Sequence, residues 1–480
     1  MCVSRHLLSA LFGVTLTVSA QAAPPNFVVI MTDDQTLETV VQMGQTASAG
    51  LFGDVTKDGT TFLNSYVVVS QCGPSRASFL TGQYPHNHGL YSNNTSPNGY
   101  ASFSEASTLA TWLQQSGYRT GLIGKYINGY GSVLHVGGVG PPSLWVPPGW
   151  NDWEAFVAPN YYNYQINVNG ALETHGSTAA DYSTDVLAAK AANFITASGG
   201  GPFFLWVTLN APHDPFTPPP RYATAYAGVA GPRRVGWNEA DMSDKPAWLR
   251  ALPLLGPAGS NVVPWIDATH DGQMGALLAV DDAIVTILGA LNTSGALPNT
   301  YVIFTSDNGY MKGEHRIPYD KIVAYDQSAK VPLIIRGPNV LAERTRSEIV
   351  SNIDVTATIL DLAGIMPGRI IDGTSFRQML STPVTTPIHN YQLLEFMVNF
   401  PQPYPVSTGP SYTIPAFGAV VSGSYKYIKS DTGEIELYDR TADPFETNSV
   451  HANPTMAGTV ATYDGMLQLL KACVGTQCIQ

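Results

Sequence analysis

Short, uninterrupted apolar runs recur along this chain, and helix-like stretches separate them. A strand that is apolar at every position must be covered on both faces, because a half-exposed strand would alternate apolar and polar residues. The apolar runs are 26–31, 203–209, 301–305 and 331–337. Helical periodicity appears at Leu109, Trp112 and Leu113, and again from Met274 to Leu288. The pattern predicts an α/β fold: a large sheet between layers of helices, with ligands at the carboxyl ends of its strands.

The pattern changes towards the C-terminus, where shorter segments joined by turns replace the long apolar runs. The segments 417–430 and 435–440 are of this kind, and they predict a small antiparallel sheet. With 480 residues, the chain exceeds one ordinary domain. We therefore expect a large catalytic domain over 23–385 and a smaller α+β domain over 386–480.

The first 22 residues have the features of a signal peptide. Arg5 and His6 precede an apolar run, and an A-x-A cleavage site ends at Ala22. A membrane-spanning helix is the weaker interpretation, because the apolar run is short and the prolines of Pro24-Pro25 follow it closely. We expect a protein that is secreted or periplasmic after cleavage near Ala22, with no later segment able to cross a membrane.

The charge of the chain argues against one class of partner, and its cysteines single out one residue for explanation. The chain carries 24 basic and 36 acidic residues, a net charge of -12, which argues against nucleic acid as a partner. Cys2 leaves with the leader, while Cys473 and Cys478 are close enough in sequence to form a disulfide. Cys72 is left over, and an odd thiol in an oxidising compartment needs a reason.

Polar residues follow two of the predicted strands directly. Asp33 and Asp34 come after the first strand, and Asp307 and Asn308 follow the strand at 301–305. Three carboxylates and an amide at matching positions of one sheet would repel one another unless a cation neutralised them. An all-oxygen set favours a hard ion such as calcium or magnesium. The alternative is that each pair only forms a turn at a strand end.

The stretch CGPSRASFLTG, residues 72–82, surrounds the odd cysteine. Ser75 is a candidate N-cap for a short helix that ends at Gly82, so Cys72 would lie at a helix N-terminus with Arg76 one turn further on. Such a position favours an anion. A buried structural thiol is the simpler alternative, and a cysteine protease would leave the clustered carboxylates unexplained.

This stretch matches, position for position, the signature C-x-P-S-R-x-x-x-L-T-G of the formylglycine-dependent sulfatases, which belong to the alkaline-phosphatase-like superfamily. The chain resembles that family over nearly its whole mature length, as in MTDDQ (31–35), TSDNGY (305–310) and KVPLIIRGP (330–338). The resemblance implies that a formylglycine-generating enzyme converts Cys72 to Cα-formylglycine during export. The hydrated aldehyde would then supply a gem-diol nucleophile for the hydrolysis of sulfate esters.

The resemblance also implies a ligand set for calcium. Asp33, Asp34, Asp307 and Asn308 would hold the ion together with the oxygen of modified Cys72. A divalent cation at this place lowers the pKa of a hydroxyl group and screens the incoming sulfate.

Four cationic or titratable residues complete the site that the resemblance implies. Arg76 would hold the aldehyde hydrate, whereas Lys125, His213 and Lys321 would contact the sulfate oxygens. Either His213 or Lys321 would protonate the leaving oxygen.

One departure from the family pattern indicates which branch of the family this chain resembles. Lys125 is followed by Tyr126 and Ile127, where many sulfatases have tryptophan and then the histidine that assists sulfate release. The segment GKYINGYG, 124–131, is similar instead to the branch of the N-acetylglucosamine-6-sulfatases and the heparan sulfate 6-O-endosulfatases, so Asn128 is expected to bind substrate. The acidic chain shows no basic patches for a long polyanion, which favours a small or exo-cleaved substrate.

We therefore expect a sulfated carbohydrate with a primary 6-O-sulfate as substrate. Exposed aromatic residues could pack against its ring, although they could equally be core residues; they are Trp150, Trp153, Tyr161 and Tyr162. The alternatives are an arylsulfatase of broad specificity, a phosphonate or phosphate monoester hydrolase, and a sugar-binding protein that has lost catalysis.

Overall fold

The computed structural model describes most of the mature chain. The described residues are 23–46, 55–94, 98–134, 137–256, 261–384, 386–405 and 409–480. The predicted signal peptide, residues 1–22, lies outside them.

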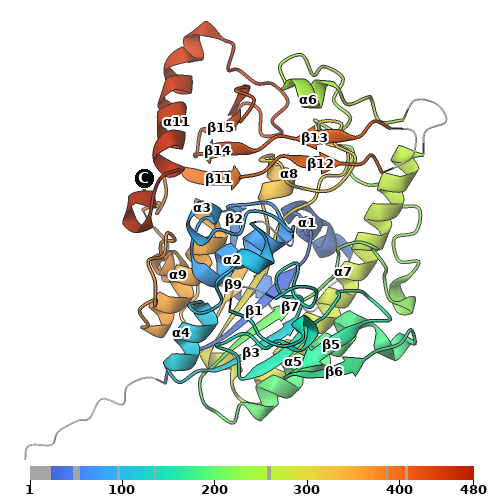
Figure 1. The fold of residues 1–480 in the computed structure, drawn as a ribbon, viewed down its shortest axis with the longest axis vertical. Helices are drawn as coiled ribbons and strands as arrows, with labels where there is room; N and C mark the ends of the chain where they lie inside the picture. Colours follow the sequence, from blue (N-terminus) through green and yellow to red (C-terminus); the bar gives the residue numbers. More distant parts are fainter. Residues whose placement is uncertain are drawn as a thin grey trace, which may run out of the picture.

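A mixed sheet of ten strands forms the centre of the described structure (Figure 1). The strand order is β10-β2-β9-β8-β1-β7-β3-β4-β5-β6. The strands are β1 (Asn26–Thr32), β2 (Gly59–Tyr66), β3 (Arg119–Gly124), β4 (Asp152–Phe156), β5 (Gln165–Val168), β6 (Ala171–Thr174), β7 (Phe203–Thr208), β8 (Thr300–Ser306), β9 (Leu333–Arg336) and β10 (Arg344–Ser351). The four apolar runs are β1, β7, β8 and β9, so the predicted α/β class is confirmed. β1 pairs in parallel with β7 and β8, and β9 runs antiparallel to β8.

Strand β1 shows why these runs are apolar at every position. Val28 and Ile30 point into one core, and Phe27, Val29 and Met31 point into the other. Helices α5 (Ser183–Ala197) and α7 (Val262–Thr293) cover the first face, while α2 (Cys72–Thr81), α4 (Leu109–Gln115) and α9 (Asn352–Ala363) cover the second. The remaining helices are α1 (Leu37–Thr46), α3 (Pro85–His88), α6 (Ala247–Arg250), α8 (Asp326–Ala329), α10 (Arg377–Ser381) and α11 (Ala457–Leu470).

Helix α7 bears on the expectation that no later segment could cross a membrane. Among the described residues, it is the helix that is long and apolar enough to cross a bilayer by length and composition. However, 67% of its most apolar 18-residue stretch is buried inside the fold, as in the core helix of a globular protein.

The C-terminal segment forms the predicted antiparallel sheet, which lies above the main sheet in Figure 1. Its strands, in spatial order, are β11 (Gln392–Phe396), β14 (Phe417–Val421), β15 (Tyr425–Ser430) and β16 (Ile435–Asp439), and β12 (Phe400–Gln402) and β13 (Tyr412–Ile414) form a separate pair. Residues of both sheets, such as Tyr66 and Leu393, share one apolar core. The predicted disulfide between Cys473 and Cys478 is present. The division at residue 385 stays a prediction.

Candidate active site

Two neighbouring strands bring the predicted oxygen ligands together. Thr32, the last residue of β1, is the register partner of Ser306, the last residue of β8. Because these strands are parallel, the segments Asp33-Asp34 and Asp307-Asn308 leave the sheet at the same point. The backbone N–H of Asp34 donates to Oδ1 of Asp307 at 3.2 Å. The convergence that the strand pattern predicted is therefore observed.

Helix α2 brings the free thiol to this edge of the sheet. Its first residue is Cys72, and the extended residue Gln71 is the N-cap. The prediction of Ser75 as N-cap was wrong, because the Ser75 N–H already donates a helical hydrogen bond to the Gln71 carbonyl at 2.9 Å. Pro74 is accommodated because an N–H in the first turn would have no partner within the helix. The Cys72 side chain thus lies at the positive end of the helix dipole.

Two asparagines lie over the first turn of α2. Oδ1 of Asn93 accepts the Gly73 N–H at 2.8 Å, and Oε1 of Gln71 accepts the Asn93 N–H at 3.0 Å. A Cβ at Gly73 would come within 2.7 Å of Asn93 Oδ1 and 3.4 Å of the Asn128 Cβ, so a larger residue there would displace the Asn93 side chain. The structure thus places Asn128 beside the thiol-bearing turn. Sequence reasoning missed Gln71 and Asn93, because only the tertiary contact identifies them.

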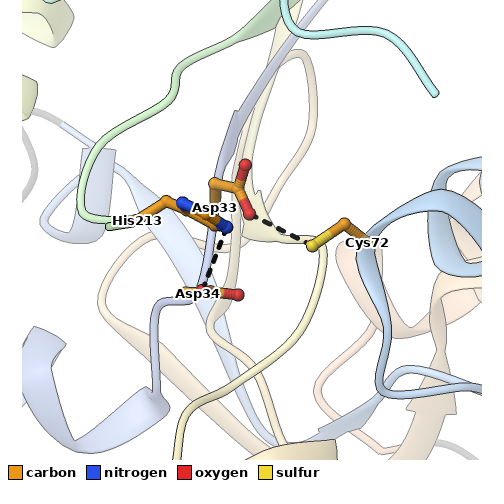
Figure 2. A group of neighbouring side chains, drawn as sticks. All are labelled: Asp33, Asp34, Cys72 and His213. Atoms are coloured by element: carbon orange, nitrogen blue, oxygen red, sulfur yellow. Dashed lines mark hydrogen bonds and ion pairs between the residues drawn. The ribbon is translucent and has the colours of Figure 1, made fainter. Parts of the chain in front are cut away.

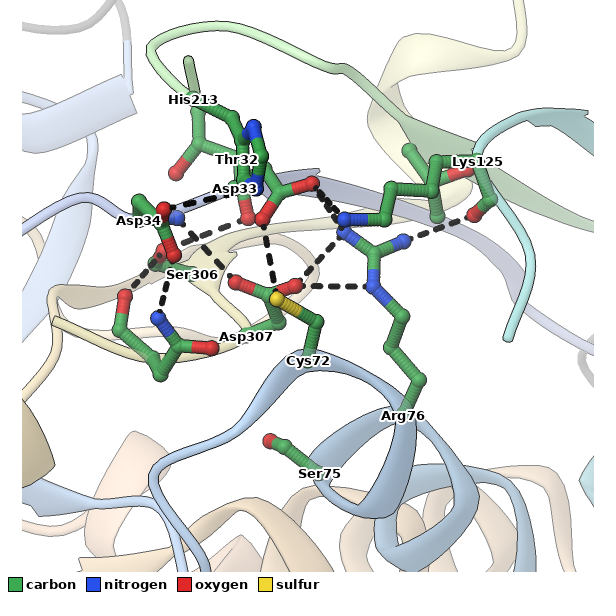
Figure 3. Close-up of polar contacts among 12 residues, drawn as sticks. Thr32, Asp33, Asp34, Cys72, Ser75, Arg76, Lys125, His213, Ser306 and Asp307 are labelled. Atoms are coloured by element: carbon green, nitrogen blue, oxygen red, sulfur yellow. Dashed lines mark hydrogen bonds and ion pairs between the residues drawn. The ribbon is translucent and has the colours of Figure 1, made fainter. Parts of the chain in front are cut away.

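Arg76 joins three parts of the site (Figure 3). Its Nε and Nη2 both lie 2.8 Å from Oδ2 of Asp307, and Nη1 donates to the Lys125 carbonyl at 2.7 Å. The ammonium group of Lys125 pairs with Asp33. Cys72 Sγ donates to Oδ1 of Asp33 at 3.4 Å. The buried side chains of Arg76 and Lys125 therefore hold the carboxylates of Asp307 and Asp33 in place next to the thiol.

Asp34 contacts the remaining polar side chains of the site (Figures 2 and 3). Oδ1 of Asp34 lies 2.5 Å from Lys321 Nζ and accepts from Asn308 Nδ2 at 2.6 Å. His213 Nε2 lies 3.7 Å from Asp34 Oδ2, while Nδ1 lies 2.9 Å from the Asp214 carbonyl. The structure thus brings together all the catalytic and metal-binding candidates from the sequence.

Burial and charge act in opposite directions on these groups. Burial alone would raise the pKa of Asp33, but nearby cations, led by Lys125, hold that pKa far below its usual range. Burial would lower the pKa of Lys321, yet Asp34 raises it well above its usual value. Burial and then Asp33 raise the pKa of the Cys72 thiol far above its usual value. A neutral thiol is a poor nucleophile, which argues against the cysteine protease alternative.

The arrangement fits a hard cation. Burial, followed by the neighbouring Asp33, raises the pKa of Asp307 to about 6, and a bound cation would relieve this repulsion. Among the described residues, no hydrogen-bond partner reaches the buried Oδ1 of Asn308. Ligand atoms of Asp33, Asp34, Cys72 and His213 all lie within 4.8 Å of one another (Figure 2). Carboxylate and amide oxygens are the ligands that calcium prefers.

A cleft of about 350 Å³ opens onto this cluster. Its lining includes Asp34, His213 and Lys321 of the cluster, together with several aromatic side chains. The aromatic lining residues are Phe216, Trp265, Tyr310, Tyr319 and Phe400. The cleft is large enough for a single sugar ring, and aromatic faces are suited to pack against one.

The aromatic residues singled out from the sequence have a different role. Trp150, Trp153 and Tyr161 are buried in the two cores, and Tyr162 packs against one of them. The expectation that they are exposed was wrong. Trp153 stacks edge to face with Tyr126, so it supports the segment after Lys125 from within the core.

Comparison with known proteins agrees with this geometry. A family model described as Sulfatase matches residues 25–365, and one described as N-sulphoglucosamine sulphohydrolase, C-terminal, matches residues 313–472. The N-acetylglucosamine-6-sulfatase of Capra hircus is 33% identical over 490 residues, which cover 95% of this chain and 84% of that protein. An arylsulfatase of Volvox carteri is 32% identical over 516 residues, covering 96% and 77%.

A solved structure also shares the fold. It is a complex of a protein with its substrate D-glucosamine-2-N,6-O-disulfate, and it superposes with a TM-score of 0.78 at 24% identity, covering 93% of this chain and 97% of that one. The family model spans most of the described chain, and the goat sulfatase is similar over almost all of it. On this evidence the chain belongs to the sulfatase family and is a sulfuric ester hydrolase.

Proposed function

We propose that this sulfatase hydrolyses the 6-O-sulfate of N-acetylglucosamine or a closely related hexosamine, using Cα-formylglycine made from Cys72 and a bound calcium ion. The observation that carries the proposal is the position of Cys72 at the positive end of α2, facing Asp33 at 3.4 Å. A group at this place is surrounded by cations suited to a sulfate, with Arg76 and Lys125 behind it.

Calcium would be held by the oxygens of Asp33, Asp34, Asp307 and Asn308. In the structure the amide of Asn308 donates to Asp34, and a rotation about its Cβ–Cγ bond would turn Oδ1 towards the carboxylates instead. When bound, the ion supplies Lewis-acid stabilisation of the sulfate charge, and the aldehyde supplies the hydrated nucleophile that a neutral thiol does not.

The remaining side chains divide into two groups by position. Arg76 and Lys125 are buried at the sheet edge, so they hold the carboxylates and add positive charge where the sulfate binds. His213 and Lys321 line the cleft, from which the alcohol leaves. His213 is the better proton donor on geometry, because the Asp214 carbonyl holds Nδ1 and leaves Nε2 pointing to the site.

The substrate assignment rests on the cleft and on the relatives. An aromatic cleft next to the sulfate-binding residues suits one sugar ring, and the goat relative is an N-acetylglucosamine-6-sulfatase. Asn128 lies beside the first turn of α2, where its amide could bind a sugar hydroxyl. The retention of Cys72 and both lysines supports hydrolysis over passive sugar binding.

The proposal includes export to an oxidising compartment, where the formylglycine-generating enzyme would meet the chain. The Cys473–Cys478 disulfide supports a secreted or periplasmic location, since disulfides persist in such compartments.

Broad arylsulfatase activity is the second candidate, favoured by the similarity to the Volvox enzyme. Release of sulfate from 6-sulfated N-acetylglucosamine, its 3-sulfated isomer and an aryl sulfate separates the two, with an aryl phosphonate as a check on the phosphonate alternative. We expect the 6-sulfated sugar to have the highest kcat/KM among the sugars. Cleavage of the aryl sulfate alone would contradict the substrate assignment while leaving sulfate ester hydrolysis intact.

A further inference from the structure

The cleft contains acidic side chains beyond the sulfate-binding end. Asp214 and Asp320 line it next to His213 and Lys321, their immediate neighbours in the chain. Among the described lining residues, Lys321 is the only lysine or arginine. Its Nζ lies 2.5 Å from Asp34 but 3.9 Å from Asp320, so the ammonium charge is directed towards the catalytic end. Asp214 and Asp320 therefore add negative charge to the cleft lining, and Lys321, which pairs more closely with Asp34, offsets that charge only in part.

Asp320 is held in position by the surrounding structure. The side-chain amide of Gln402, which is only 4% exposed, donates to Asp320 Oδ2. The Asp320 carbonyl accepts the Met311 N–H at 2.7 Å, and the residue has a left-handed backbone with φ of 75°. A buried partner and a constrained backbone hold this carboxylate in the cleft lining.

The neighbouring aromatic side chains define where a ring would lie. Trp265 and Tyr319 meet edge to face, with ring centroids 5.6 Å apart, and both line the cleft. The Tyr319 hydroxyl donates to the Pro403 carbonyl at 2.7 Å, which fixes the tyrosine. Because Asp320 directly follows Tyr319, a sugar that packs against this pair has its other substituents close to a carboxylate.

We propose that Asp214 and Asp320 select substrates by charge. The cleft accepts a sugar whose substituents beyond the scissile sulfate are neutral or cationic, such as N-acetyl or free amine, and rejects one with a second sulfate. Like charges brought together at a binding site disfavour binding, and specificity is commonly built from such repulsion. The choice of a hexosamine rests on the proposed function, whereas the charge selection itself does not.

The substrate named for the structural neighbour, D-glucosamine-2-N,6-O-disulfate, is the kind of compound that this selection excludes. The test therefore compares kcat/KM for 6-sulfated N-acetylglucosamine and for its N-sulfated counterpart. We expect the wild-type enzyme to prefer the N-acetyl compound by about tenfold or more. Asp214→Asn and Asp320→Asn should each reduce this ratio, mainly through KM of the disulfated substrate, and the double variant should reduce it most.

Two controls make the result specific. Asp431→Asn removes an exposed carboxylate that does not line the cleft, so the ratio should not change. A pair of aryl sulfates with and without a second sulfonate group repeats the comparison without a sugar. If the enzyme prefers the aryl sulfate without the second sulfonate group but cleaves neither sugar, the result would support the charge selection and refute the hexosamine assignment. A ratio near one in the wild type, or a ratio that Asp214→Asn and Asp320→Asn leave unchanged, would overturn the proposal.

Discussion

Arg76 Nη2 lies 2.8 Å from Asp307 Oδ2, and both side chains are completely buried. The same guanidinium group donates to the Lys125 carbonyl, so one side chain connects α2 to the ends of β8 and β3. The orientation of the helix that carries Cys72 therefore depends on this ion pair. It is a structural connection as well as part of the proposed sulfate-binding charge.

Replacing Arg76 by alanine should destabilise the protein strongly. It leaves Asp307 buried without its partner, and breaking such a pair costs about 3–5 kcal/mol. Urea denaturation measures the change in the free energy of unfolding. Arg377→Ala is the matched control, because its pair with Asp361 is half exposed and should contribute under about 1 kcal/mol. Equal effects of the two changes would refute the structural role of Arg76.

Removing one ligand charge should weaken metal binding. Asp307→Asn preserves the shape of the side chain but lowers the negative charge around the proposed ion. We expect less calcium in the purified variant by elemental analysis, and a smaller rise in Tm on adding calcium than the wild type shows. Asp361→Asn, a surface carboxylate, serves as control. Equal calcium content in Asp307→Asn and wild type would rule out Asp307 as a ligand.

Loss of the proton donor should depend on the leaving group. His213→Ala is expected to lower kcat/KM for the 6-sulfated sugar by about 10²–10⁴-fold, because a sugar alcohol needs protonation as it leaves. A nitrophenyl sulfate, with a good leaving group, should lose much less. Lys125→Ala should reduce both to a similar extent, since the buried Lys125, paired with Asp33, is proposed to act on the sulfate and not on the leaving group. If Lys321→Ala shows the leaving-group dependence and His213→Ala does not, the proton donor is Lys321.

Much of this site could be predicted because it depends on local sequence patterns. Continuous apolar runs locate β1 and β8, and parallel pairing then brings Asp33 and Asp307 together. The start of α2 was misplaced because a serine three residues into the signature is a good N-cap by composition. Gln71 takes that role because the chain is extended there, which is a tertiary outcome.

The cleft was harder to predict for a different reason. Aromatic residues have the same appearance in sequence whether they lie in a core or line a pocket, so Trp153 was expected to be exposed although it lies in a core. Trp265 belongs to the long core helix α7, and only the packing of that helix places it beside Tyr319. Residue pairs this distant in sequence leave no local signal.

Stability should depend on pH through Glu105. Burial raises the pKa of this carboxyl to about 7, although Tyr100 and Trp145 donate hydrogen bonds to it. The folded state then binds a proton that the unfolded state releases near pH 4.5. This proton contributes up to about 3 kcal/mol to the free energy of unfolding. The contribution is fully present below pH 4.5 and is lost as the pH rises through 7.

Glu105→Gln removes the titration while keeping the side-chain shape. Urea denaturation at pH 5 and pH 8 should therefore show a larger loss of stability for wild type than for the variant. Parallel pH dependence in the two proteins would show that Glu105 does not titrate in this range.

The most direct test of the central claim is the mass of the peptide that contains Cys72, measured together with the specific activity of the same preparation. We predict that active enzyme from a host with the modifying enzyme carries an aldehyde in place of the thiol, and that sulfate release rises in proportion to the aldehyde fraction. Cys72→Ala should be inactive. Full activity in a preparation whose Cys72 peptide has only the mass of the free thiol would contradict the account.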